Sequence, residues 1–334
     1  MSEKPIQAYL FQRIKEMLPP DTSLVDTVAA VLHVSQDSAY RRIRGETLLV
    51  LEEAKILCEE FGLSLDQLLH ATTRSVIFEN IELNSSATDF TQYLKGILQE
   101  LQALHACNQK SITYVTIDIP FFYQLCYQPV FAFRYFFWMK SIADHPDFRQ
   151  RKFTLDCLPA ETEAIGKEIL SLYCKIPSAE VWNTECINGT LNQISYYQEA
   201  GFVTKEDVGS IYTALRQTVE HLQLQAECGV KFLPGENPRA SKQNFQLFHN
   251  RIGLGDNIIF TTSDNGKKIY MNYDALSYLT TTDEAFCTIA QQQFKTIMRR
   301  STLISNVSEK QRNLFFNVLY RKLPLPTTTI VKPV

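Results

Sequence analysis

The stretch VAAVLHVSQDSAYRRIRG, residues 28–45, decides the fold of the N-terminal region. Its apolar residues recur at the three- and four-residue spacing of one helical face, and Asp21 or Ser23 can cap the helix to which they belong. A turn follows, and Ser35 is a typical N-cap for the short helix after it. Gly45 then ends this short helix, because glycine adopts the left-handed conformation of a helix end at low cost.

Helical patterns lie on both sides of this stretch. Residues 5–18 and 50–61 each place apolar side chains at helical spacing, and residues 64–69 have the pattern of a capped fifth turn. Five short helices joined by short turns form a unit that can fold alone. We therefore predict an all-α five-helix domain over residues 1–72.

The same stretch resembles the helix-turn-helix of the lambda-repressor-like, or xenobiotic-response-element, family of bacterial transcriptional regulators. Ala29 is a small residue where the two helices of that motif cross, Leu32 packs the turn, and Ser35 caps the recognition helix. The resemblance covers residues 20–70. It implies a DNA-binding domain whose recognition helix, at about 35–44, lies in the major groove of double-stranded DNA.

The docking geometry of this family implies which side chains contact DNA. A glutamine at the start of the recognition helix can pair with adenine, an aspartate can accept from cytosine, and arginines contact phosphates or guanine. The predicted DNA-binding residues are Ser35, Gln36, Asp37, Tyr40, Arg41, Arg42 and Arg44.

Two features of the sequence depart from a typical member of the family. His33 stands in the turn where the family commonly has glycine, although histidine tolerates a positive φ better than most residues. Residues 1–70 hold seven Lys and Arg against eleven Asp and Glu, a net charge of −4. Because phosphate neutralisation supplies most non-specific affinity, we expect a homodimer in which two arginine patches act together. The alternative is a helical module that binds another protein and not DNA.

The remainder of the chain is predicted to be α+β. Residues 73–110 are expected to form a linker strand and helix, and residues 111–334 a mostly helical domain with a small antiparallel sheet, for dimerisation and effector sensing. The expected elements are a strand at 111–119, a helical region at 120–229, an antiparallel meander at 243–273 with an Asn265-Gly266 turn, and helices at 283–300 and 308–321.

Segments of this second region are similar to the uncharacterised C-terminal regions of such regulators, a resemblance that implies no ligand. They are DIPFFYQL at 118–125, FRYFFWMKS at 133–141 and STLISNVSEKQRNLFF at 301–316. The aromatic residues here either line a small-molecule effector pocket or form core or dimer interface, and the second interpretation is favoured. They are Phe121, Phe122, Tyr123, Phe131, Phe133, Tyr135, Phe136, Phe137 and Trp138.

Composition and motifs argue against other classes. The net charge is −3, and the eight cysteines show no CxxC pair or zinc-site spacing, so no metal and no cofactor are predicted. No catalytic motif is recognised, and the protein is not expected to be an enzyme. Acidic and basic residues stand near the N-terminus where a signal peptide would need an unbroken apolar core, and the apolar segment at 129–143 contains Arg134 and Lys140. A cytoplasmic protein without membrane contact is therefore expected. A basic stretch at 288–322 either supplements DNA contact or is an ordinary solvated surface.

Overall fold

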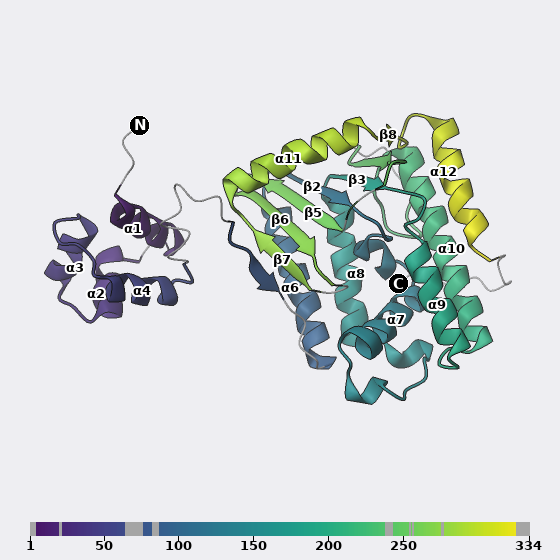
Figure 1. Cartoon of the computed structure of the whole chain (residues 1–334), viewed down its shortest axis with the longest axis horizontal. Helices are drawn as coiled ribbons and strands as arrows, with labels where there is room; N and C mark the ends of the chain where they lie inside the picture. The colour runs from purple at the N-terminus through teal and green to yellow at the C-terminus, as the bar shows by residue number, and fades with distance from the viewer. Residues whose placement is uncertain are drawn as a thin grey trace. The chain divides into compact units, whose positions relative to one another are not determined.

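The computed structural model divides the chain into two compact units, Met1–Ile77 and Phe78–Val334 (Figure 1). The structure describes residues 5–19, 22–63, 76–81, 87–237, 243–253, 255, 257–274 and 277–324.

Four helices make up the described part of the N-terminal unit. They are α1 (Ile6–Met17), α2 (Leu24–Leu32), α3 (Gln36–Ile43) and α4 (Leu51–Glu60). Each contributes to one small core, formed by Leu10, Phe11, Ile14, Val28, Ala39, Leu57 and Cys58. The predicted five-helix domain is therefore corrected to four helices within the described residues, and the predicted fifth turn at 64–69 lies outside them.

Within the described residues, the second unit is built on one mixed eight-stranded sheet with the order β1-β7-β6-β5-β2-β3-β4-β8. The strands are β1 (Glu79–Ile81), β2 (Lys110–Val115), β3 (Ser178–Trp182), β4 (Phe245–His249), β5 (Ile258–Ser263), β6 (Gly266–Asn272), β7 (Tyr278–Thr281) and β8 (Thr302–Leu303). The pairs β2–β3 and β3–β4 are parallel, and the other pairs are antiparallel.

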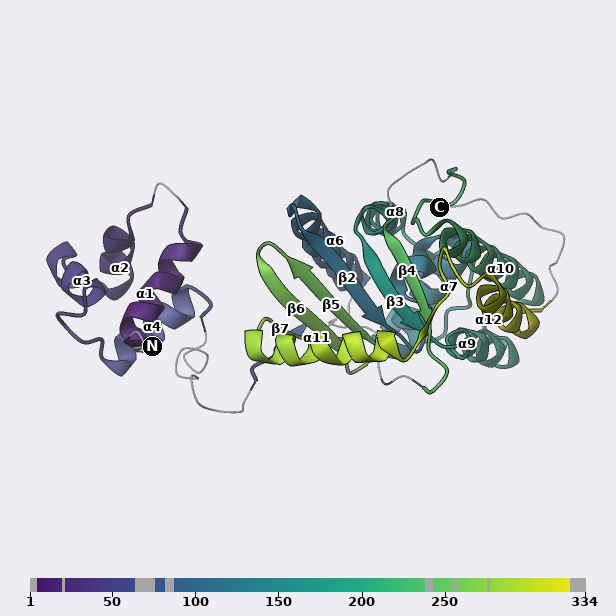
Figure 2. The ribbon, with the colours of Figure 1, turned by 90° about the horizontal axis from the view of Figure 1, so that it is seen from above.

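Helices cover both faces of this sheet (Figure 2). They are α6 (Ala87–Ala106), α7 (Gln128–Phe137), α8 (Ala160–Lys175), α9 (Asn188–Glu199), α10 (Lys205–Cys228), α11 (Glu284–Arg299) and α12 (Glu309–Lys322), with the short turns η1 (Phe121–Leu125), η2 (Trp138–Ile142), η3 (Pro146–Phe148) and η4 (Leu155–Cys157). Helix α11 packs Cys287, Ala290 and Phe294 on one face, against Val115 of β2 and Val181 of β3. The larger core lies on the other face, where side chains from α6, α7, α8 and α10 meet the sheet.

The prediction of a small antiparallel sheet is wrong. The segment SAEVW of β3 lies inside the region 120–229 that was expected to be helical, and β4 pairs in parallel with β3 and not with β5. The error has a physical cause, because β3 is a short strand buried on both faces with Glu180 at its centre, so that it shows neither an apolar run nor alternation. The predicted antiparallel hairpin β5–β6 is present, with Asp264 and Asn265 in the turn and Gly266 as the first residue of β6, paired with Ser263.

The aromatic cluster predicted around α7 forms part of the larger core. Seven of its nine residues are buried, and Phe121 and Phe137 pack against them. The apolar segment at 129–143 is divided between α7 and η2. Among the described residues, the structure holds no helix with the length and apolarity that crossing a bilayer requires.

Candidate nucleic-acid interface

Helices α2 and α3 each begin at a serine N-cap, and a tight turn at His33–Ser35 joins them. The Ser23 hydroxyl accepts a hydrogen bond from the Asp26 amide at 3.3 Å, and the Ser35 hydroxyl accepts one from the Ser38 amide at 3.3 Å. Between them His33 ends α2 in the left-handed conformation, with φ 52°. These local contacts satisfy backbone groups at the helix ends and fix the direction in which α3 leaves the turn.

Most of the predicted DNA-binding residues are exposed on or beside α3. Tyr40 is 47% exposed, and the side chains of Arg41 and Arg44 are each 58% exposed. The exposed members of the predicted set are Ser35, Gln36, Asp37, Tyr40, Arg41 and Arg44. Helix α3 and its two ends therefore expose hydrogen-bond donors, hydrogen-bond acceptors and cations to solvent.

Arg42 is placed differently from the other predicted residues. Its Nε and Nη2 atoms donate to the two carboxylate oxygens of Glu53 on α4, at 3.0 and 2.7 Å, and Nη1 donates to the Ser38 carbonyl at 3.2 Å. The hydrogen bonds to Glu53 raise the pKa of Arg42, and the same contact lowers the pKa of Glu53. The structure thus uses Arg42 to hold α3 against α4.

A second contact that the sequence did not reveal involves Gln7 of α1. Its amide nitrogen donates to the carbonyls of Arg42 and Thr47 at 2.7 and 2.8 Å, and its oxygen accepts from the Leu49 amide at 3.0 Å. Gln7 therefore fixes the chain that follows α3. Neither Gln7 nor Glu53 could be recognised from the sequence, because each lies far along the chain from its partner and belongs to no motif.

The exposed side chains of α3 make weak pairs with their neighbours. Arg41 is 3.1 Å from Asp37, and Arg44 is 3.4 Å from Glu46, in both cases between side chains that are more than half exposed. Gln36 donates to the Asp26 carboxylate at 2.5 Å. Exposed ion pairs of this kind contribute little stability. A ligand with stronger acceptors, such as a phosphate, can therefore replace them.

The basic stretch at 288–322 does not form one exposed surface. Arg312 is buried and donates to the carbonyls of Ile304 and Val307, both at 3.2 Å. Lys322 is half-buried and lies 3.0 Å from Glu185. The exposed cations of this stretch are Lys295, Arg299, Arg300, Lys310 and Arg321. The two buried or paired residues have structural roles within the second unit.

The interior of the second unit contains charged groups of another kind. Glu180, fully buried on β3, accepts hydrogen bonds from the Tyr123 and Tyr173 hydroxyls at 2.8 and 2.5 Å and from the Trp182 indole at 3.0 Å. Lys231 is 4% exposed, and its amine lies 3.7 Å from the centre of the Tyr173 ring. Burial raises the pKa of Glu180 and lowers the pKa of Lys231 to about 8.

A further buried pair lies near the start of α9. Asp118 is 3.7 Å from Arg134, and its other oxygen accepts from the Ile119 amide at 2.8 Å. Burial raises the pKa of Asp118 and lowers that of Arg134. Across the described ranges, His, Cys, Asp and Glu side chains form no group of three that could hold a metal ion.

Comparison with models of protein families, with curated proteins and with solved structures gives no match for this chain. The arguments that follow therefore rest on its own residues.

Proposed function

We propose that the protein is a sequence-specific DNA-binding transcriptional regulator, with α3 as the recognition helix. The observation that carries this proposal is the exposed set on α3, in which Gln36, Asp37 and Tyr40 stand beside the cations Arg41 and Arg44. Such side chains supply the base-edge and phosphate contacts that a helix in the major groove makes. A regulator of this kind acts in the cytoplasm of a bacterium.

The roles of the three arginines differ in this proposal. Arg41 and Arg44 contact phosphate or guanine, because both are exposed and held only by weak surface pairs. Arg42 is a positioning residue, since its guanidinium is committed to Glu53. DNA binding then requires the Arg42–Glu53 contact to stay intact while the Asp37–Arg41 pair opens.

The protein binds DNA as a homodimer in this proposal. The net charge of −4 over residues 1–70 opposes the approach of a single copy to DNA. Two copies present two pairs of exposed arginines to successive major grooves, so each copy adds its own phosphate contacts. Sedimentation of the full chain with and without a selected DNA duplex tests this step, and a monomer on the duplex contradicts it.

The test of DNA binding starts from duplexes selected out of a random pool by the full chain. The double variant Arg41→Ala, Arg44→Ala is expected to weaken binding of the selected duplex at least tenfold and to reduce its salt dependence. The matched control is Arg13→Ala, Lys55→Ala, which removes two exposed, ion-paired cations from α1 and α4. Equal affinities of the two variants, both folded by circular dichroism, would contradict the proposal.

A protein-binding module is the second candidate, and an apolar surface favours it. Leu48, Val50 and Leu51, between α3 and α4, are 77%, 56% and 68% exposed. Apolar side chains gathered in this way are typical of protein interfaces. If the selection enriches no duplex, while Leu48→Ser with Leu51→Ser abolishes self-association or capture of a protein partner, this second function replaces the first.

A further inference from the structure

The segment after α7 departs twice from regular backbone geometry. Residues Trp138–Ile142 form a π-helical turn, in which the Ala143 amide donates to the Trp138 carbonyl at 2.9 Å. Just beyond it Asp144 has φ 45°, a left-handed conformation that few residues other than glycine adopt. Both features are concentrated at functional sites in proteins. The surface around this segment is therefore a candidate ligand site.

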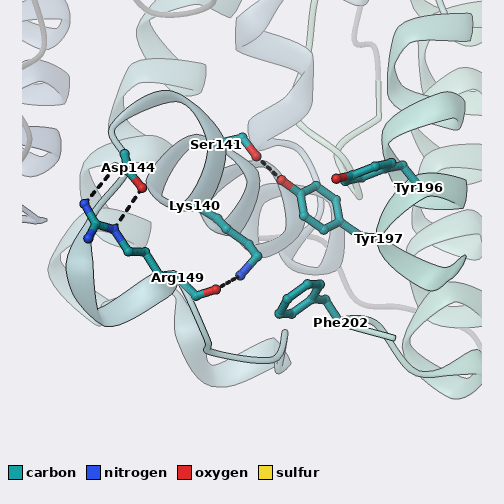
Figure 3. Close-up of a pocket in the computed structure, with 7 residues that line it drawn as sticks. All are labelled: Lys140, Ser141, Asp144, Arg149, Tyr196, Tyr197 and Phe202. Carbon is teal, nitrogen blue, oxygen red and sulfur yellow. Dashed lines mark hydrogen bonds and ion pairs between the residues drawn. The ribbon is translucent and has the colours of Figure 1, made fainter. Parts of the chain in front are cut away.

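That surface contains a pocket of about 260 Å³ (Figure 3). Its polar wall comes from η2 and the turn after it, and its aromatic wall from α9 and the chain that follows α9. The residues of the polar wall are Lys140, Ser141, Asp144 and Arg149, and those of the aromatic wall are Tyr196, Tyr197 and Phe202. The volume is slightly below the range for drug-sized ligands, so a ligand the size of one ring fits it.

The Lys140 amine of the polar wall is held in place before any ligand binds, whereas Arg149 forms an exposed ion pair. The Lys140 amine donates to the carbonyls of Phe148 and Arg149 at 2.8 and 2.5 Å and stands 3.6 Å from the centre of the Phe202 ring. Arg149 donates through Nε and Nη2 to the Asp144 carboxylate at 3.0 and 2.7 Å. A ligand that uses Lys140 needs little ordering of that side chain, which favours affinity.

The polar wall favours a negatively charged ligand. Lys140 and Arg149 carry two positive charges against the single negative charge of Asp144. The contacts of Arg149 with Asp144 use Nε and Nη2 and not Nη1, and the two carbonyls leave Lys140 one further N–H. Donors therefore exceed acceptors in this wall, and charge-assisted hydrogen bonds to an anion are the strongest contacts it can make.

The aromatic wall adds a flat apolar surface beside these donors. Tyr196 is 65% exposed, although its ring is large and apolar, and it meets the Tyr197 ring edge to face at 5.2 Å. Tyr197 is itself fixed by a hydrogen bond with Ser141. An exposed ring held in this way offers a platform for a second aromatic ring.

We propose that this pocket binds a small aromatic carboxylate. The carboxylate lies against the cations of the polar wall, and the ring packs on the aromatic wall. This proposal is independent of DNA binding by the N-terminal unit, because each pocket residue belongs to the second unit.

The test titrates the full chain with benzoate by calorimetry or NMR. Saturable binding in the millimolar range is expected for a ligand of this size, with benzamide, which lacks the charge, at least tenfold weaker. Inorganic phosphate, which has charge without a ring, is also expected to bind more weakly. Benzoate binding no tighter than that of benzamide or phosphate overturns the proposal.

Two variants test whether benzoate binds in this pocket. Arg149→Gln is expected to weaken benzoate binding about tenfold, the loss of one charge-assisted contact, and Tyr196→Ala several-fold. Both side chains are exposed, so the fold is retained, which thermal melting checks. The matched control is Arg13→Gln, which removes another exposed arginine paired with a carboxylate. The same benzoate affinity in Arg149→Gln and Arg13→Gln overturns the proposal.

Discussion

The two units hold their charged side chains in opposite ways. In the N-terminal unit the Arg42–Glu53 contact keeps some access to solvent, and the pKa values of both groups shift toward their charged forms. In the second unit Glu180 and Lys231 are buried, and the pKa values of both shift toward their neutral forms. The comparison teaches that hydrogen bonding outweighs desolvation at the edge of a small domain, whereas desolvation outweighs pairing in a large interior.

The difference between the two kinds of charged contact should appear in the free energy of unfolding of their variants. The Arg42–Glu53 pair, whose side chains are 15% and 18% exposed, stabilises the fold directly, because its hydrogen bonds outweigh the hydration that it loses. A buried network carries a desolvation cost that other packing must offset, so removing one partner leaves a buried polar group unsatisfied.

The largest expected effect comes from removing the buried carboxylate. Glu180→Leu leaves the Tyr123 and Tyr173 hydroxyls without their acceptor, and we expect it to lower the free energy of unfolding by about 3–5 kcal/mol. Urea denaturation followed by tryptophan fluorescence measures this, because both tryptophans, Trp138 and Trp182, lie in the second unit. Glu220→Leu, at an exposed position of α10, is the control. Equal losses in the two variants would show that the network contributes nothing.

The next effect is a pH dependence caused by Lys231. Its pKa falls from 10.5 to about 8 in the fold, so between these pH values the unfolded chain binds more protons than the folded chain. The free energy of unfolding should therefore rise as the pH increases from 8 to 10.5, by up to about 3 kcal/mol relative to Lys231→Met. Denaturation curves of the two proteins across this range check the prediction, and parallel pH profiles contradict it.

The Arg42–Glu53 pair should give a smaller loss of stability, confined to the N-terminal unit. Arg42→Met removes the hydrogen bonds to Glu53 and should destabilise this unit by about 2 kcal/mol. Hydrogen exchange of the α3 and α4 amides measures it. Arg41→Met removes only an exposed ion pair, so it should change the free energy of opening measured by exchange by less than about 0.5 kcal/mol. An Arg41 effect as large as that of Arg42 would remove the distinction between them.

The smallest effect concerns the cap of α3. Ser35→Ala should cost about 1 kcal/mol, because the Ser38 amide loses its acceptor, whereas Ser35→Asp should retain it. Exchange of the first α3 amides reports both variants. If Ser35→Asp loses as much as Ser35→Ala, the cap does not stabilise this helix.

The sequence predicted the N-terminal elements better than the sheet. N-caps such as Ser23 and Ser35 bond to residues three positions later, so a short stretch of sequence is enough to predict them. The parallel pairing of β3 with β2 and β4 joins strands that are separated in sequence by whole helices. The charged Glu180 at the centre of β3 also interrupts the apolar pattern from which a strand is predicted. Sheet topology of this kind carries no short-range pattern.

The candidate interface shows the same division. The exposure of Gln36, Tyr40 and Arg41 agrees with a helix that has one solvated face. The sequence could not separate Arg42 from its neighbours, because its partner Glu53 lies on another helix. Likewise, the pocket beside Lys140 is assembled from segments of the chain about fifty residues apart.

Strand β1 has a consequence for biosynthesis. Its residues 79–81 pair with β7 at 278–281. During translation β1 is therefore synthesised almost two hundred residues before the strand with which it pairs. The four N-terminal helices share a core of their own and can form while the ribosome is still translating. The sheet cannot close at that edge until β7 has emerged, and β1 keeps unpaired backbone groups until then.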